Sequence, residues 1–238
     1  MSQFDLTPLL KYAQSENIAL PENAAEMFET YGRLLVEWNE KINLTAIIEP
    51  EEIVIKHFCD CLSVLKFIDL KKGTKLIDIG SGAGFPGMVL KILRPEADIY
   101  LLDGHAKRFI FLDALQSELG VYTKNLHQRA EEAAKKTPIR ESFDFVTARA
   151  VSNLSVLDEL TLPFLKVGGT FISMKGPAPE EELLSAKKGI FLLGGGNEKI
   201  EKVTLPDGSV HSIIKINKIS QTPTKYPRAY GKITKQPL

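Results

Sequence analysis

The sequence has few cysteines, no long apolar run and no net charge, and each shortage excludes a class of protein. No apolar stretch approaches the roughly 18 residues of a membrane-spanning helix, and the first residues lack the basic and apolar regions of a secretory signal. Its two cysteines, Cys59 and Cys61, are two positions apart, which rules out an extracellular disulfide framework. We therefore expect a cytoplasmic protein without a membrane partner.

The formal charge of zero results from two unequal parts of the chain. Up to Asp69 there are 5 Lys or Arg against 12 Asp or Glu, so the remainder holds 25 basic residues of the 30 and 18 acidic residues of the 30. The basic part begins where a glycine-rich stretch begins. This distribution is expected if the second part meets a polyanion.

That glycine-rich stretch, residues 76–87, has the sequence LIDIGSGAGFPG. Its first four residues read as a short buried strand, and apolar residues at helical spacing follow the glycines. Pro86 suits the first turn of that helix, where its missing N–H costs nothing. A strand, a glycine turn and a helix point free backbone N–H groups at a ligand above the end of the strand.

The glycine spacing alone leaves two ligands open. Gly82, Gly84 and Gly87 satisfy the dinucleotide pattern G-x-G-x-x-G, so NAD remains an alternative. Asp78 favours another ligand, because a carboxylate there would repel a pyrophosphate but suits a cationic group such as the ammonium of a methionine moiety. An acidic residue followed by G-x-G-x-G resembles the first motif of class I S-adenosylmethionine (AdoMet) methyltransferases.

After the glycine turn, strands alternate with helices, which predicts a parallel sheet. We expect strands at residues 98–103, 121–126 and 143–147, then a glycine turn that leads into a fifth strand ending at Lys175, and a helix from about residue 179. Asp103 ends the second strand, 19 residues past Gly84, where a carboxylate can accept hydrogen bonds from both hydroxyls of a ribose. It indicates a nucleoside without choosing between NAD and AdoMet.

Two alternating segments, residues 199–205 and 210–216, flank the turn PDGS and predict a hairpin. Methyltransferase sheets typically finish with an antiparallel strand reached through such a turn, whereas dinucleotide-binding sheets usually continue in parallel. The last residues, 222–238, hold four cations, no acid and two tyrosines, a mixture that suits phosphate contacts and base stacking.

Before the glycine turn, apolar residues at three- and four-residue steps predict helices between about residues 6 and 67. One of them carries His57, Cys59 and Cys61, which raises the question of a metal. On a helix, Cys59 points away from the face that His57 and Cys61 share, and no third or fourth ligand of the right type clusters nearby in sequence. We therefore predict packing thiols and no metal site.

The order of several motifs along the whole chain resembles that of the RsmG (GidB) family. They are NLTAI at residues 43–47, HF at 57–58, DIGSGAGFPG at 78–87, LD at 102–103 with KR at 107–108, RAE at 129–131, ARA at 148–150, KG at 175–176 and YPR at 226–228. Cys61 departs from the family, which usually has serine there. The resemblance implies an enzyme that methylates guanine N7 in 16S ribosomal RNA, in the 530 loop.

The resemblance also implies which residues form the site. The residues expected to bind AdoMet are Asp78, Gly80, Gly82, Gly84, Phe85, Asp103, Ala130, Glu131 and Arg149. Those expected around the target base are Asn43, His57, Arg149 and Lys175. Direct transfer to N7 requires no covalent intermediate.

The predicted fold is therefore α/β, a class I AdoMet-dependent methyltransferase (Rossmann-like) sheet with an antiparallel C-terminal hairpin. Its expected divisions are an N-terminal helical segment at residues 1–70, an AdoMet-binding domain at 71–220 and a basic tail at 221–238. We expect a monomer that acts on 16S ribosomal RNA or the small ribosomal subunit particle. Two alternatives are an NAD-dependent oxidoreductase on a Rossmann-like sheet and a non-catalytic nucleotide-sensing module.

Overall fold

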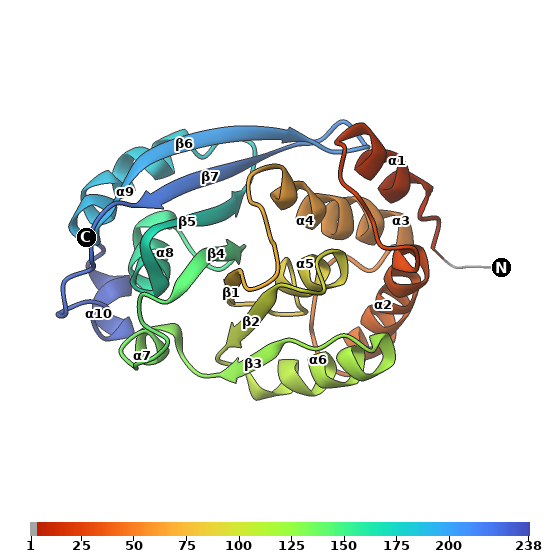
Figure 1. Cartoon of the computed structure of the whole chain (residues 1–238), viewed down its shortest axis with the longest axis horizontal. Coiled ribbons are helices and arrows are strands. Elements are labelled where there is room, and N and C mark those ends of the chain that lie inside the picture. Colours follow the sequence, from red (N-terminus) through yellow and green to blue (C-terminus); the bar gives the residue numbers. More distant parts are fainter. Residues whose placement is uncertain (1–3) are drawn as a thin grey trace.

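A seven-stranded sheet runs through the middle of the part of the chain described by the computed structural model, residues 4–238 (Figure 1). The strands are β1 (Lys75–Ile79), β2 (Asp98–Asp103), β3 (Lys124–His127), β4 (Phe143–Arg149), β5 (Leu165–Lys175), β6 (Gly195–Thr204) and β7 (Val210–Lys218). Their order across the sheet is β3-β2-β1-β4-β5-β7-β6. The strands from β1 to β5 pair in parallel, and β7 pairs antiparallel with both β5 and β6. The predicted fold class, including the C-terminal hairpin, is confirmed.

Helices precede the sheet and connect its strands. The α-helices are α1 (Thr7–Ser15), α2 (Ala24–Asn39), α3 (Pro50–Glu52), α4 (Asp60–Leu62), α5 (Gly87–Leu93), α6 (Ala106–Leu119), α7 (Ala130–Ala133), α8 (Leu154–Thr161), α9 (Glu180–Leu192) and α10 (Tyr230–Lys235). A π-helical segment, Ile53–Cys59, joins α3 to α4, and short 3₁₀ turns occupy Ser63–Lys66 and Leu162–Phe164.

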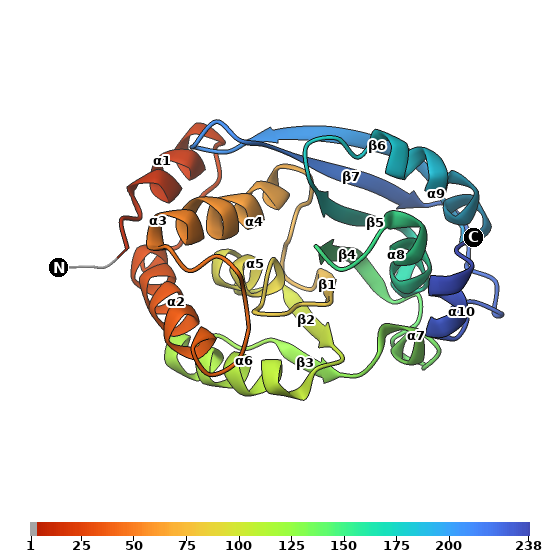
Figure 2. The ribbon, with the colours of Figure 1, turned by 180° about the vertical axis from the view of Figure 1, so that it is seen from behind.

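Both faces of the sheet are covered by helices (Figures 1 and 2). The buried apolar residues of α1, α2, α5, α6 and the π-helical segment form one core with one face. Those of α7, α8, α9 and α10 form a second core with the other face. A parallel sheet needs this double cover because the apolar side chains on both of its faces must be buried.

The N-terminal helices pack directly on the glycine turn that follows β1. The Tyr31 hydroxyl of α2 donates a hydrogen bond of 2.5 Å to the carbonyl oxygen of Ala83. The Tyr31 ring stacks on Phe85 with 5.2 Å between ring centroids. The predicted helical segment, whose first three residues lie outside the described range, thus shares one core with the sheet.

Strand β3 begins later than predicted. The expectation was a strand over residues 121–126, but β3 is Lys124–His127. The Gln116 side chain of α6 accepts hydrogen bonds from the backbone N–H and the hydroxyl of Thr123, at 2.7 and 3.1 Å. These bonds engage the Thr123 N–H and keep it out of the strand ladder.

The C-terminal residues fold back onto the molecule. Arg228 forms a bidentate pair with Glu159 of α8, whose side chain is fully buried. The Arg140 guanidinium donates to the backbone carbonyl oxygens of Thr222 and Tyr226, at 2.8 and 2.9 Å. Among residues 4–238, no helix is long and apolar enough to cross a membrane.

Candidate active site

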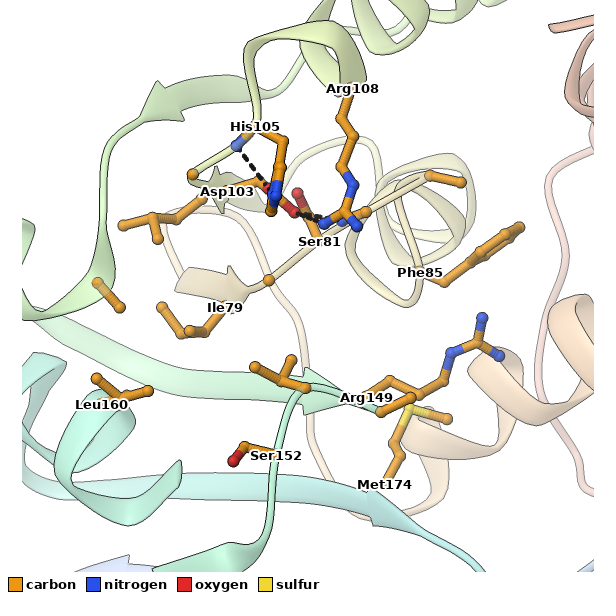
Figure 3. Close-up of a pocket in the computed structure, with 18 of the residues that line it drawn as sticks. Ile79, Ser81, Phe85, Asp103, His105, Arg108, Arg149, Ser152, Leu160 and Met174 are labelled. Atoms are coloured by element: carbon orange, nitrogen blue, oxygen red, sulfur yellow. Dashed lines mark hydrogen bonds and ion pairs between the residues drawn. The ribbon is translucent and has the colours of Figure 1, made fainter. Parts of the chain in front are cut away.

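A cleft of about 800 Å³ opens at the carboxyl ends of β1, β2, β4 and β5 (Figure 3). The strand order reverses between β1 and β4, the point at which open α/β sheets form a ligand crevice. One side holds Asp103, His105 and Arg108, and the opposite side holds Arg149 and Met174. We call the first side the Asp103 end of the cleft and the second side its Arg149 end.

The glycine turn after β1 forms the floor of the cleft. Gly80, Ser81, Gly82, Ala83 and Phe85 line it. A Cβ at Gly80, which has a φ of +71°, would lie 2.6 Å from the Val151 side chain, so only glycine fits there. The Ser81 hydroxyl is buried without a hydrogen-bond partner among the described residues.

Asp78 lies beneath this turn and does not line the cleft. One carboxylate oxygen accepts the Gly87 N–H at 2.9 Å, and the other accepts the Thr147 hydroxyl at 2.9 Å. Burial raises the pKa of Asp78 to about 7, although both hydrogen bonds lower it. The arrangement makes Asp78 an anchor between β1, β4 and α5, and its predicted contact with a cationic ligand stays a prediction.

Asp103 is the most heavily hydrogen-bonded carboxylate of the cleft. Its oxygens accept from the backbone N–H of Gly82 at 3.0 Å, from Arg108 at 2.6 Å, and from the backbone N–H and ring of His105 at 2.9 and 3.0 Å. Burial alone would raise the pKa of Asp103, but these hydrogen bonds outweigh it and hold the pKa below its usual value. A fixed anionic acceptor thus faces the cleft.

Beyond Asp103, the start of α7 and the C-terminal helix close this end of the cleft. Ala130 and Glu131 line it, as predicted from the motif RAE. The Arg129 guanidinium lies 4.4 Å from the centre of the Tyr230 ring, and both residues border the cleft. Tyr230 was not among the predicted site residues.

At the Arg149 end, side chains from four segments of the chain form one hydrogen-bonded chain. The Thr45 hydroxyl oxygen lies 2.8 Å from Nε2 of His57, and Nδ1 of His57 lies 3.1 Å from Nη2 of Arg149. Nη1 of Arg149 lies 3.4 Å from Asp60, and the other oxygen of Asp60 lies 2.9 Å from Nδ1 of His211. All five side chains line the cleft.

The π-helical segment explains how His57 reaches the cleft. Its wider turns carry Lys56 and His57 on the side that faces β4, and such turns often occur at functional sites. The ring of His57 lies 4.5 Å from that of Phe85. Burial, together with the nearby Arg149 charge, lowers the pKa of His57 to about 3, so the ring is neutral.

Lys175 lines the cleft, but its ammonium group binds neighbouring protein atoms. Its Nζ donates to the carbonyl oxygen of Ser152 at 2.9 Å and to Glu182 at 2.6 Å. These bonds tie the end of β5 to the loop after β4, where Ala150 has a φ of +53°. Lys175 is therefore placed to position that loop.

The remaining predicted residues lie outside the cleft. Asn43 is exposed, and neither it nor Gly84 lines the cleft, so their roles stay predictions. Cys59 and Cys61 are fully buried and also lie outside it. Burial raises the pKa of both thiols, that of Cys59 to about 12, which makes them poor nucleophiles.

Sequence reasoning missed several residues of the cleft, among them Thr45, Asp60, His211 and Tyr230. Thr45 stands in the motif NLTAI, which could have pointed to it. His211 is part of the predicted hairpin, and nothing in the sequence marks it as a partner of Asp60.

Comparisons with known proteins find a matching family and similar sequences. The family model for GidB, rRNA small subunit methyltransferase G, matches residues 24–211. The chain is 49% identical over 223 residues to ribosomal RNA small subunit methyltransferase G of Clostridium tetani, covering 93% of each chain. It is 48% identical to the protein of the same name from Clostridium novyi, covering 94% of each chain.

Two solved structures share the fold at low sequence identity. TrmN from Thermus thermophilus has a TM-score of 0.55 at 17% identity, covering 68% of this chain and 49% of that one. A SAM-dependent O-methyltransferase from Thermotoga maritima has a TM-score of 0.54 at 14% identity, covering 79% of this chain and 72% of that one.

Proposed function

Because the chain belongs to the rRNA small subunit methyltransferase G family, we propose that it methylates N7 of a guanosine in the 530 loop of 16S ribosomal RNA. The methyl donor is S-adenosylmethionine. The single observation that carries the proposal is the cleft at the switch point of the sheet, with an anionic acceptor at one end and a cationic, aromatic cluster at the other. The enzyme would act in the cytoplasm as a monomer, on naked RNA or on the small ribosomal subunit.

The residues of the cleft fit S-adenosylmethionine. Asp103 offers a carboxylate for the ribose hydroxyls, which would take the place of the exposed His105 ring among its four donors. The unpartnered hydroxyl of Ser81 lies in the adjoining glycine turn. Ala130 and Glu131 border the space where an adenine ring would lie. The volume of about 800 Å³ is within the usual range for a small-molecule site.

When bound, S-adenosylmethionine would supply a methyl group on a sulfonium, a good leaving group because its sulfur becomes a neutral thioether when the bond to the methyl carbon breaks. Guanine N7 carries an in-plane lone pair and no proton at neutral pH, so no base is needed to activate it. The work of the protein is to hold N7 in line with the methyl carbon, and orientation can lower a barrier by roughly 7–11 kcal/mol. The neutral His57 ring, the Phe85 ring and the Arg149 guanidinium contact one another and form a fixed surface against which a base can pack.

The substrate RNA would reach the cleft through its cationic surroundings. Lys56 and Arg129 line the cleft, and Lys107 is exposed beside Arg108. The exposed lysines of the C-terminal residues, Lys225, Lys232 and Lys235, add to this charge. Such groups bind phosphates and position the RNA without reading its sequence.

The cofactor assignment predicts a loss of affinity in the variant Asp103→Ala. Removing an ionised acceptor of the ribose hydroxyls should weaken S-adenosylmethionine binding by about 1.5–3 kcal/mol. Calorimetric titration of the folded variant would measure it. Asp98→Ala, at the far end of the same strand, should bind as the wild type does; equal affinities of all three proteins would remove Asp103 from the site.

The identity of the methylated nucleoside tests the proposed function. Small-subunit ribosomal RNA from cells lacking this protein, incubated with the enzyme and labelled cofactor, should yield 7-methylguanosine by mass mapping. The double variant Cys59→Ser, Cys61→Ser should keep its activity, because both thiols are buried away from the cleft. Label recovered as 5-methylcytidine, or activity lost in the double variant, would indicate covalent chemistry instead.

A further inference from the structure

Thr45 is held at the Arg149 end by bonds that fix its hydroxyl oxygen. The Asn39 side chain accepts the backbone N–H groups of Leu44 and Thr45, at 2.8 and 2.9 Å. The Thr45 oxygen in turn accepts the backbone N–H of Ile47 at 3.0 Å. One of its two lone pairs is therefore occupied by the main chain.

The second lone pair of the Thr45 oxygen faces His57. The contact with Arg149 determines which ring nitrogen of His57 carries the proton. Arginine cannot accept a hydrogen bond, so Nδ1 of His57, 3.1 Å from Nη2 of Arg149, must be the acceptor. The Lys56 carbonyl oxygen also lies 3.2 Å from Nδ1, but a proton placed on Nδ1 to reach it would face the Nη2 donor group of Arg149. Since the ring is neutral, its one proton lies on Nε2 and points at the Thr45 oxygen, 2.8 Å away.

The Arg149 orientation on which this depends is itself fixed. Its guanidinium lies 4.8 Å from the centre of the Phe85 ring and donates to Lys56. Asp60 accepts from both Arg149 and His211. Asp60 therefore holds the charged end of Arg149 against His57.

With both lone pairs used, the Thr45 hydroxyl can only donate. Within residues 4–238, His57 and Ile47 are the partners of this oxygen, and the side chain lines the cleft. Its proton is thus left for a ligand in the cleft. At this place the Thr45 hydroxyl presents a hydrogen-bond donor of fixed position beside the tilted rings of His57 and Phe85.

Resting on the proposed function, we infer that Thr45 selects guanine by donating its hydroxyl proton to O6 of the target base. Guanine shows two acceptors, N7 and O6, on that edge, whereas adenine shows the N7 acceptor and an amino donor. N7 is the attacking atom and must be left without a hydrogen bond, so O6 is the acceptor that remains for recognition. An adenine would bring its amino group against the Thr45 hydroxyl proton.

The test combines substitutions at Thr45 with a change of the target base in the RNA. We would compare wild type, Thr45→Val and Thr45→Ser on RNA carrying guanosine at the methylated position and on RNA carrying 2-aminopurine there, which keeps N7 but lacks O6. On guanosine, kcat/KM of Thr45→Val should fall about 5–50-fold, the loss of one buried hydrogen bond, and Thr45→Ser should stay within a few-fold of wild type. On 2-aminopurine, wild type and Thr45→Val should have equal rates.

The outcomes separate this inference from the proposed function. An equal loss by Thr45→Val on both RNAs would show that Thr45 only supports the fold of the loop, and would overturn the inference. Failure of the wild type to form 7-methylguanosine would overturn the proposed function itself. Nitrogen-15 NMR of His57 gives a readout without turnover: a proton on Nε2 supports the inference, and a proton on Nδ1 contradicts it.

Discussion

Arg149→Ala should lower the single-turnover rate of methyl transfer by about 100-fold or more, because misplacing a reacting base by about 1 Å can cost that much. Arg149 donates to His57 and to the Lys56 carbonyl oxygen, and its guanidinium lies against the Phe85 ring. Without the Arg149 guanidinium, the side chains of His57 and Phe85 lose the contacts that fix their positions at this end of the cleft. The rate should be measured at saturating cofactor, so that weaker binding does not enter.

Two further variants sharpen this result. Arg149→Lys keeps a positive charge but not the planar, multiply donating group, and it should recover little of the rate. Arg33→Ala removes an exposed arginine from α2 and should transfer methyl groups at the wild-type rate. A rate for Arg149→Ala within a few-fold of wild type would contradict the role given to this end of the cleft.

Arg228→Ala should destabilise the fold by about 3–5 kcal/mol, the usual effect of leaving a buried charge without its partner. Glu159 is fully buried on α8 and accepts both the backbone N–H of Arg228, at 2.7 Å, and its guanidinium, at 2.6 to 3.0 Å. Removing the arginine leaves this carboxylate buried without its cation. Urea unfolding monitored by circular dichroism measures the loss.

A double variant tests the cause. Glu159→Gln combined with Arg228→Met removes both charges and should be more stable than Arg228→Ala alone. Lys225→Ala, an exposed cation three residues away, should change the free energy of unfolding by no more than about 0.5 kcal/mol. An Arg228→Ala variant as stable as Lys225→Ala would show that the pair contributes little.

This pair also changes how the C-terminal residues should be tested for RNA binding. The sequence predicts a basic tail at residues 221–238, and deleting it would remove Arg228 together with its lysines. Loss of RNA binding in such a deletion could then reflect unfolding. Neutral replacements at Lys225, Lys232 and Lys235 remove exposed charges and leave the Glu159 pair intact.

The sequence predicts what local patterns control and misses what distant contacts control. The glycine turn, the strand ending in Asp103 and the hairpin after β5 each follow from neighbouring residues, and the structure has all three. The insertion of β7 between β5 and β6 depends on pairing across the sheet, which no local pattern reports.

The same distinction holds for the cleft. Asp103 and the motif RAE stand at strand ends and could be placed in advance. His211 lines the cleft beside Asp60, which lies 151 residues earlier in the chain. The hydrogen bonds of Asp78 to the Gly87 N–H and to Thr147 beneath the turn depend on residues further along the chain, and its contact with a ligand stays a prediction.

The hydrogen-bonded chain from Thr45 to His211 bears on when the enzyme first becomes active during its own synthesis. Domains form as the polypeptide emerges, N-terminal parts first, at about 5–20 residues per second. Strands β1 to β4 are complete well before β7 is made, so a nascent chain acquires the glycine turn and Asp103 before His211 can join Arg149 as a partner of Asp60. The nascent chain therefore presents a partly built cleft, without His211, until the last strand has joined the sheet.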